Sequence, residues 1–273
     1  MKRIIAIIGA VGIISLAAQA QVLLTSGLTV SENFDTLTTS STTAQPSWTD
    51  NSTLLGWYAR RAATTSAGPY GSFTYATLRL SAGENSSGSV YDYGSFSSTD
   101  RAFGSISSGT IKSNAFGLRI QNDTGSPMYV DNISFWGEQW RRGQGNFNRT
   151  NYLWFSYQKS SSAITDPFNT STWTPFNALT FANPVFATAS SDPGIALDGN
   201  AAANRTYISV NMGNLPLSPG EEIFLRWVDP DESGNDMGLA IDDLTVTIVP
   251  EPSTAVLGGL ALLGLIAWRR MRR

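Results

Sequence analysis

The sequence predicts an all-β protein, folded as an antiparallel β-sandwich of the jelly-roll kind. Short segments in which apolar and polar residues alternate follow one another along the chain, and clusters of turn-forming residues separate them. Charged residues make up 14% of the chain, which suits an exported β protein better than a solvated helical one. No sequence repeat or change in composition divides the body, so we expect one domain over residues 21–249, flanked by two targeting segments.

The first targeting segment has the three parts of a secretory signal peptide. Residues 1–3 carry two basic side chains, residues 4–17 are apolar, and Ala18-Gln19-Ala20 has the small residues of a cleavage site. We therefore predict export through the Sec machinery and cleavage by signal peptidase before Gln21. An uncleaved N-terminal anchor is the alternative, but the short apolar run and the small residues at its end favour cleavage.

The body contains a series of predicted strands. In residues 115–121, for example, Phe116 and Leu118 share a face while Arg119 points to the other. The predicted strands are residues 27–34, 54–60, 75–80, 90–93, 102–106, 115–121, 128–136, 151–159, 205–212, 223–227 and 238–249. The side chains that we expect in the core are Phe116, Leu118, Ile120, Leu153, Phe155, Ile208, Val210, Leu225 and Trp227.

The composition excludes several kinds of chemistry. Cysteine and histidine are both absent, so the chain has no disulfide, no Ser-His-Asp triad, no cysteine nucleophile and no zinc site of the usual ligands. The net charge is −3 with the basic ends included, and no basic patch is present to neutralise phosphates. A nucleic-acid partner is therefore not expected.

A glycine-rich segment at 137–145 follows a predicted strand and is a candidate glycan-binding site. If its tryptophan is exposed, Trp140 would stack on a sugar ring while Glu138, Gln139 and Arg141 form hydrogen bonds to it. The alternative is a structural corner, in which Trp140 is buried and Glu138 is paired with an arginine.

A second candidate is an acidic segment near the end of the body. Its carboxylates lie around Gly234 with spacings that would suit calcium, which takes six to eight oxygen ligands. The EF-hand pattern fails at its bidentate glutamate, where Ala240 stands, and a solvated turn held by Asx hydrogen bonds is the alternative. The candidate ligands are Asp229, Asp231, Asp236, Asp242 and Asp243.

Two of these aspartates create a conflict in the last predicted strand. Leu239 and Ile241 share one face, whereas Leu244 and the apolar residues after it share the other. Either the strand contains a bulge at 242–243, or the side that is covered changes there.

The end of the chain has three distinct parts. Pro250-Glu251-Pro252 breaks the last strand, residues 255–268 form an apolar run, and four arginines follow at Arg269, Arg270, Arg272 and Arg273. A buried core helix is the simplest alternative, but four terminal arginines would have to leave the core at once. They suit a short membrane helix over about 254–268, with its basic end held on the cytoplasmic side.

These three parts, in this order, resemble the PEP-CTERM sorting signal of Gram-negative bacteria. The resemblance implies recognition by an exosortase, a membrane-embedded cysteine transpeptidase that cuts near the proline–glutamate–proline triplet. It also implies a brief stay in the inner membrane, followed by delivery to the cell surface or the extracellular space. The segment 225–246 resembles the last strand pair of jelly-roll ectodomains often found on PEP-CTERM proteins, which implies a fold and no activity.

Three functions remain open for the body. The first is a non-catalytic protein of the cell surface or extracellular matrix, and the second is a lectin-like module that binds extracellular polysaccharide. The third is a secreted hydrolase, which would need two carboxyls about 5–9.5 Å apart across a cleft. No sequence pattern places two acids in that way.

Overall fold

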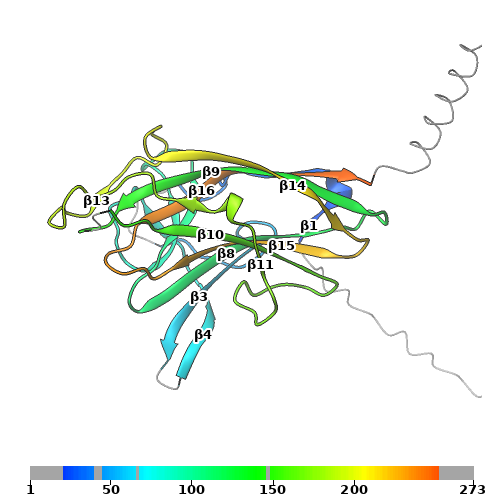
Figure 1. Cartoon of the computed structure of the whole chain (residues 1–273), viewed down its shortest axis with the longest axis horizontal. Helices are drawn as coiled ribbons and strands as arrows, with labels where there is room; N and C mark the ends of the chain where they lie inside the picture. The colour runs from blue at the N-terminus through cyan, green and yellow to red at the C-terminus, as the bar shows by residue number, and fades with distance from the viewer. Residues whose placement is uncertain (1–20, 40–44, 66–67, 146–147, 252–273) are drawn as a thin grey trace, which may run out of the picture.

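The protein is a sandwich of two β-sheets, as the sequence predicts (Figure 1). The structure is a computed structural model that describes residues 21–39, 45–65, 68–145 and 148–251. The predicted signal peptide and most of the predicted sorting signal lie outside these ranges. Within them, no helix has the length and apolar character needed to cross a membrane.

The first sheet, called sheet A below, is mainly antiparallel. Its strands lie side by side in the order β11 (Thr174–Pro175), β10 (Tyr152–Ser160), β15 (Glu222–Pro230), β8 (Ile111–Gln121), β3 (Trp57–Thr65) and β4 (Gly68–Thr74). Two short strands join it, β1 (Val22–Leu23) in parallel with β8 and β12 (Phe181–Ala182) beside β10. The β3–β4 hairpin projects from the rest of the body (Figure 1).

The second sheet, sheet B, packs against the first. Its strand order is β13 (Ile195–Ala196), β9 (Met128–Arg142), β16 (Gly238–Pro250), β7 (Ala102–Ile106), β6 (Ser89–Tyr93) and β5 (Arg79–Ser81). In addition, β14 (Arg205–Leu217) pairs with β9, and β2 (Thr29–Glu32) pairs with β16. Two 3₁₀ turns, η1 (Leu24–Ser26) and η2 (Asn177–Leu179), complete the elements of the described residues.

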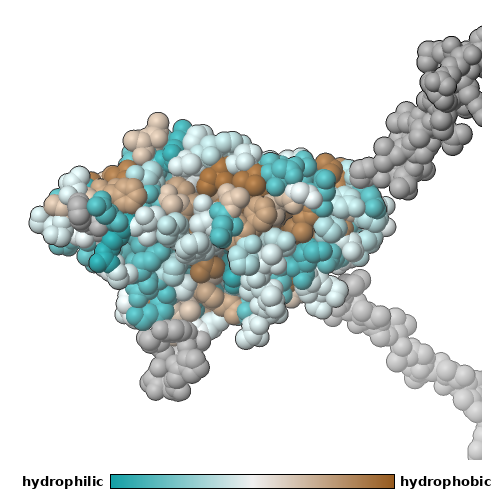
Figure 2. Space-filling view, in the orientation of Figure 1, coloured by the Kyte–Doolittle hydropathy of each residue, from teal (hydrophilic) through white to brown (hydrophobic). Residues whose placement is uncertain are grey.

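The core lies between the sheets and is rich in aromatic rings. Trp227 of β15 is fully buried, and its ring centroid lies 5.2 Å from that of Phe155 and 5.4 Å from that of Phe135 on the other sheet. The burial of seven of the predicted core residues is confirmed. Ile208 and Val210 are only half-buried, because β14 forms an edge of sheet B. On the surface, apolar residues form small patches among hydrophilic ones (Figure 2).

The predicted end of the strand at residue 136 is wrong, because β9 runs on to Arg142. Gly137 lies within the strand and has a packing role. A Cβ at this position would lie 2.3 Å from the ring of Phe181, so only glycine leaves room for that side chain. The predicted strand at 75–80 is also misplaced, since β4 ends at Thr74 and β5 begins at Arg79.

The bulge in the last strand is confirmed. The register between β16 and β9 shifts between Asp242 and Thr245, and Asp243 has a φ of 49°, in the left-handed region. As a result Asp242 is buried, Asp243 points to solvent, and Leu244 returns to the core.

Candidate functional site

The outer face of sheet A is covered over only part of its area. Residues 161–173, called the covering loop below, leave β10 and cross this face before β11. Ile164 and Trp173 from the loop pack on Phe224 and Tyr58 of the sheet. The rings of Trp173 and Phe224 meet edge to face at 5.7 Å. The rest of the face is open to solvent and has two hollows.

The first hollow, called the aromatic hollow, lies over β11, β10 and β15 and has a volume of about 470 Å³. Trp154 lines it and is 40% exposed, and the ring of Tyr152 lies 4.5 Å from the Trp154 ring. The two aromatic side chains share a face because they are two residues apart on one strand. Pro175 and Asn177 also line the hollow, as does Trp173, which lies over β15.

A stacked arginine also lines the aromatic hollow. The guanidinium carbon of Arg226 lies 3.7 Å from the centroid of the Trp173 ring. Its Nε donates a hydrogen bond to Ser156 Oγ at 3.0 Å, and its Nη1 donates to the carbonyl of Pro167 in the covering loop at 2.6 Å. Burial lowers the pKa of Arg226 to about 10, so the group remains protonated at neutral pH.

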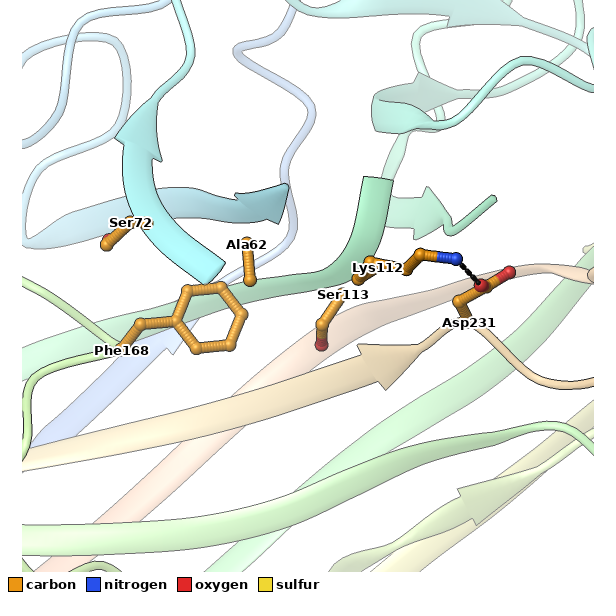
Figure 3. A pocket seen from close by; sticks show the side chains of 7 residues that line it. Ala62, Ser72, Lys112, Ser113, Phe168 and Asp231 are labelled. Carbon is orange, nitrogen blue, oxygen red and sulfur yellow. Dashed lines mark hydrogen bonds and ion pairs between the residues drawn. The ribbon is translucent and has the colours of Figure 1, made fainter. Parts of the chain in front are cut away.

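The second hollow, called the hairpin hollow, lies beside the β3–β4 hairpin and has a volume of about 510 Å³. In Figure 3 the Phe168 ring stands on one side of it and the Lys112–Asp231 pair on the other, with Ala62 and Ser113 between them. The Lys112 Nζ and Asp231 Oδ2 atoms are 3.0 Å apart. Because Ala62 and Ser113 at the centre are small, they leave the space between Phe168 and Lys112 unfilled.

The two hollows follow one another across the strands of sheet A. Pro230 of the aromatic hollow pairs with Ser113 of the hairpin hollow. Ser113 in turn pairs with Ala62 on β3, and Ala62 pairs with Ser72 on β4. The row from β11 to β4 crosses six strands, or roughly 24 Å at the usual strand spacing. The two hollows therefore lie next to each other on this face of the sheet.

Of the two alternatives for the segment at 137–145, the structure shows the one in which Trp140 is buried. Trp140 is 1% exposed, its ring stacks on Tyr93 at 5.8 Å, and its Nε1 donates to Glu138 Oε2 at 2.9 Å. Gln139 is fully buried and donates to the carbonyl of Val185 at 3.0 Å. These side chains form a packed corner of sheet B, which is the structural alternative that the sequence left open.

Arg141, the fourth residue of the candidate glycan-binding site, also makes structural contacts. Its Nη1 donates to the carbonyls of Gly83 and Glu84, at 3.0 and 3.1 Å. The expected pairing of Glu138 with an arginine takes a different form, since its hydrogen-bond donor is the indole of Trp140. Burial raises the pKa of Glu138 to about 7.

The five candidate calcium ligands do not converge on one point. Asp229 is buried, its Oδ2 accepts from the Ser105 hydroxyl at 2.7 Å, and burial raises its pKa to about 7. Asp231 is paired with Lys112 at the hairpin hollow. Asp236 accepts from the backbone N–H of Glu232 at 3.1 Å, and burial raises its pKa to about 8.

The remaining two aspartates belong to the bulge in β16. Burial, together with the nearby charge of Glu138, raises the pKa of Asp242 to about 9. Asp242 Oδ1 accepts from the backbone N–H of Asp243 at 2.7 Å. Within the described residues, no three acidic side chains lie close enough together to hold a metal ion.

The described structure ends at the start of the predicted sorting signal. Pro250 closes β16, and Glu251 Oε1 accepts a hydrogen bond from the Tyr129 hydroxyl at 3.1 Å. Pro252 and the four arginines Arg269, Arg270, Arg272 and Arg273 lie outside the described residues, as does the predicted helix at 254–268.

Residues 249–273 match the PEP-CTERM protein-sorting motif, which confirms the predicted signal and indicates an exported protein. The comparison with curated proteins gives no match. The sorting motif covers about the last tenth of the chain and gives no function for the rest. The function of the body therefore has to be inferred from its own geometry.

Some solved structures resemble the body remotely. The K2 cleaved adhesin domain of Lys-gingipain is 12% identical over 80% of this chain and 97% of that one, with a TM-score of 0.35. The K1 domain, from Porphyromonas gingivalis W83, is 14% identical over 81% and 98%, with a TM-score of 0.29. TmCBM61, in complex with β-1,4-galactotriose, is 10% identical over 56% and 72%, with a TM-score of 0.26. Similarities this slight carry no ligand over to this chain.

Proposed function

We propose that this is an exported, non-catalytic surface protein that binds polysaccharide along the outer face of sheet A. The observation that carries the proposal is the exposed Trp154 ring in the aromatic hollow, with the tilted ring of Tyr152 in contact with it. Exposed aromatic faces bury the apolar faces of sugars, and an amide such as that of Asn177 supplies hydrogen bonds to hydroxyls. The hairpin hollow extends the contact along the sugar chain.

The same geometry favours binding over hydrolysis. Asp231 is the acidic side chain among the described residues that line the two hollows, and it is paired with Lys112. Hydrolysis of a glycosidic bond requires two carboxyls on opposite sides of that bond. The two hollows supply apolar, hydroxyl and cationic groups instead.

The proposed route to the surface follows from the two ends of the chain. Residues 1–20 direct export through the Sec machinery and are removed by signal peptidase, and residues 21–249 fold outside the inner membrane. The tail at 250–273 holds the chain briefly in that membrane, with its arginines on the cytoplasmic side. An exosortase then cuts near Pro250-Glu251-Pro252, and the body passes to the cell surface or extracellular matrix.

Binding can be tested with the full chain, purified in mild detergent, on an array of polysaccharides. We expect retention on at least one polymer and at least about tenfold weaker binding by Trp154→Ala, because one stacked ring contributes about 1.4 kcal/mol or more. Tyr207→Ala is the matched control, since Tyr207 is 53% exposed but lies on sheet B. Equal loss in both variants, or unchanged binding by Trp154→Ala, contradicts the proposed site.

The route can be tested by replacing Pro250, Glu251 and Pro252 together with alanine. We expect the variant to insert normally and to remain uncut, so that it accumulates with its tail attached. Mass spectrometry of protein released from the cell surface provides the measurement. Released wild-type protein that still carries Trp268 and the terminal arginines would contradict cleavage.

A further inference from the structure

We propose that the polysaccharide bound by the aromatic hollow is acidic, and that Arg226 receives one of its anionic groups. The inference rests on the proposed glycan-binding function and adds the charge of the ligand. A uronate carboxylate and a sulfate ester share the chemistry that Arg226 recognises, so both are included in the test.

Arg226 is held in place before any ligand arrives. Its side chain is fixed at three points, by Ser156 on the neighbouring strand, by the carbonyl of Pro167 and by the ring of Trp173. The two hydrogen bonds use two of the five N–H groups of a guanidinium. The third nitrogen, Nη2, has no hydrogen-bond partner among the described residues, and it is not one of their fully buried unpartnered atoms, so it reaches solvent. It is therefore available in a hollow that Arg226 itself lines.

The protein supplies no counter-ion to this cation within the described residues. Two deeply buried arginines of the fold each have a carboxylate, as Arg101 has Asp92 at 2.6 Å and Arg119 has Glu222. The described contacts of Arg226 are a hydroxyl, a carbonyl and an indole ring. Burial alone accounts for the lowered pKa of Arg226, without an opposing carboxylate to raise it. A half-buried cation that has no carboxylate beside it favours the binding of an anion from a ligand.

The hollow suits an anion that is attached to a sugar. A guanidinium binds carboxylate and sulfate groups through two parallel hydrogen bonds, which are stronger than neutral ones. Trp154 and Trp173 would contact the ring of the same sugar, so charge and apolar surface are recognised together. The chain has a net charge of −3, so general attraction does not draw acidic polymers to it.

A purely structural role for Arg226 makes a different prediction. The bond to Pro167 and the stack on Trp173 also hold the covering loop on the sheet. If that were its whole role, replacing Arg226 would lower the melting temperature but would weaken binding to acidic and neutral polymers alike. The preference between the two kinds of polymer therefore separates the two roles.

The experiment measures the affinity of the full chain for matched pairs of polymers. The probes are alginate and polygalacturonate, each beside its carboxyl-reduced form, with dextran sulfate to test for sulfate. We expect an acidic polymer to bind at least about tenfold more tightly than its neutral counterpart, and added salt to reduce this preference. Tighter binding of dextran sulfate than of the uronates identifies sulfate as the anionic group.

Three variants identify the residue responsible. Arg226→Gln should remove the preference for acidic polymers, whereas Arg226→Lys, which keeps the charge without the paired hydrogen bonds, should retain part of it. Arg61→Gln is the matched control, because Arg61 stacks on Phe73 and Tyr75 outside both hollows and should leave the preference unchanged. If Arg226→Gln fails to fold, the comparison of Arg226→Lys with wild type still tests the inference.

The possible failures are distinguishable. Equal affinity for acidic and carboxyl-reduced polymers overturns the inference and leaves the proposed function standing. An acidic preference that survives in Arg226→Gln overturns the role of Arg226. No binding to any polymer, on this panel or on the array, overturns the proposed function itself.

Discussion

The outer faces of both sheets carry tryptophans on long strands, but Trp140 on sheet B is buried whereas Trp154 on sheet A reaches solvent. Trp140 on β9 lies under residues 197–204, and a Cβ at Gly199 would lie 2.3 Å from its ring. Trp154 on β10 lies beyond the end of the covering loop and stays 40% exposed. Both residues point away from the core on long strands, so the strand does not decide their exposure.

The difference comes from the loop that crosses each face. The backbone N–H of Leu197 donates to the Trp140 carbonyl at 2.8 Å, which holds the loop directly over the ring. On sheet A the covering loop packs on Phe224 and Tyr58 and leaves Trp154 open. A sandwich of this kind can therefore bury part of one outer face as a second small core, here around Trp140, while a tryptophan on the other outer face stays exposed.

The largest expected effect comes from removing the covered tryptophan. Trp140→Ala deletes a buried ring that stacks on Tyr93, and such changes lower the free energy of unfolding by about 3–5 kcal/mol. Denaturant unfolding of the full chain in detergent, followed by fluorescence, measures the change. A loss below about 1 kcal/mol would show that the outer face of sheet B is not a second core.

A smaller effect is expected from tightening the contact between the loop and that ring. In Gly199→Ala the new methyl group meets the Trp140 indole, and overpacking of this kind costs about 1–3 kcal/mol. Gly109→Ala is the control, because a Cβ at Gly109 has nothing within 4 Å. Equal unfolding energies for the two variants would contradict close packing of residues 197–204 on the ring.

The buried acids on the outer face of sheet B predict a pH dependence. Burial raises the pKa of Asp242 to about 9 and that of Glu138 to about 7, both above the values near 4 of an unfolded chain. The folded state therefore binds more protons than the unfolded state between about pH 4 and about pH 9, so stability is fully present below this window and falls as pH rises through it.

Asp242→Asn should make that fall shallower, because the amide does not ionise and its Oδ1 can still accept from the Asp243 N–H. The melting temperature, measured between about pH 5 and about pH 9, provides the test. Glu84→Gln, which removes an exposed acid elsewhere on the chain, is the control. If the Asp242 variant followed the wild-type slope, Asp242 would not be the group that titrates.

The smallest effect on stability is expected at the open face. Trp154→Ala removes an exposed ring, and surface substitutions of this kind usually change the unfolding energy within about 0.5 kcal/mol. Paired with the loss of polysaccharide binding expected for the same variant, this result would separate function from folding. A loss as large as that of Trp140→Ala would show that both tryptophans serve the fold.

Much of the fold could be predicted from the sequence, because strand alternation is a local property. Phe116 and Leu118 face the core as their spacing indicates, and the conflict around Asp242 left two alternatives, of which the structure has the bulge. The edge position of β14 could not be foreseen, since alternation shows which side of a strand is apolar but not how many strands flank it. Gly137 was misinterpreted because the ring that needs its space, Phe181, is distant in the sequence.

The candidate site was less predictable, for a related reason. Alternation places Tyr152 and Trp154 on the outer face, and it places Arg226 on the face opposite Trp227. The stacking of Arg226 on Trp173, however, joins a strand to a loop more than fifty residues away. The five aspartates are divided in the fold, because the charges of Asp229 and Asp231 act on Asp236, whereas Asp242 and Asp243 belong to the bulge in β16.

The position of β16 constrains when the protein can fold. This strand, which ends where the sorting motif begins, lies between β9 and β7 in sheet B and also pairs with β2. A chain that is exported N-terminus first presents β2, β7 and β9 long before the strand that joins them. Sheet B is therefore incomplete until residues 238–250 have crossed, when the sorting motif itself is next to emerge. During export, the sandwich can therefore close only at about the time when the sorting motif emerges.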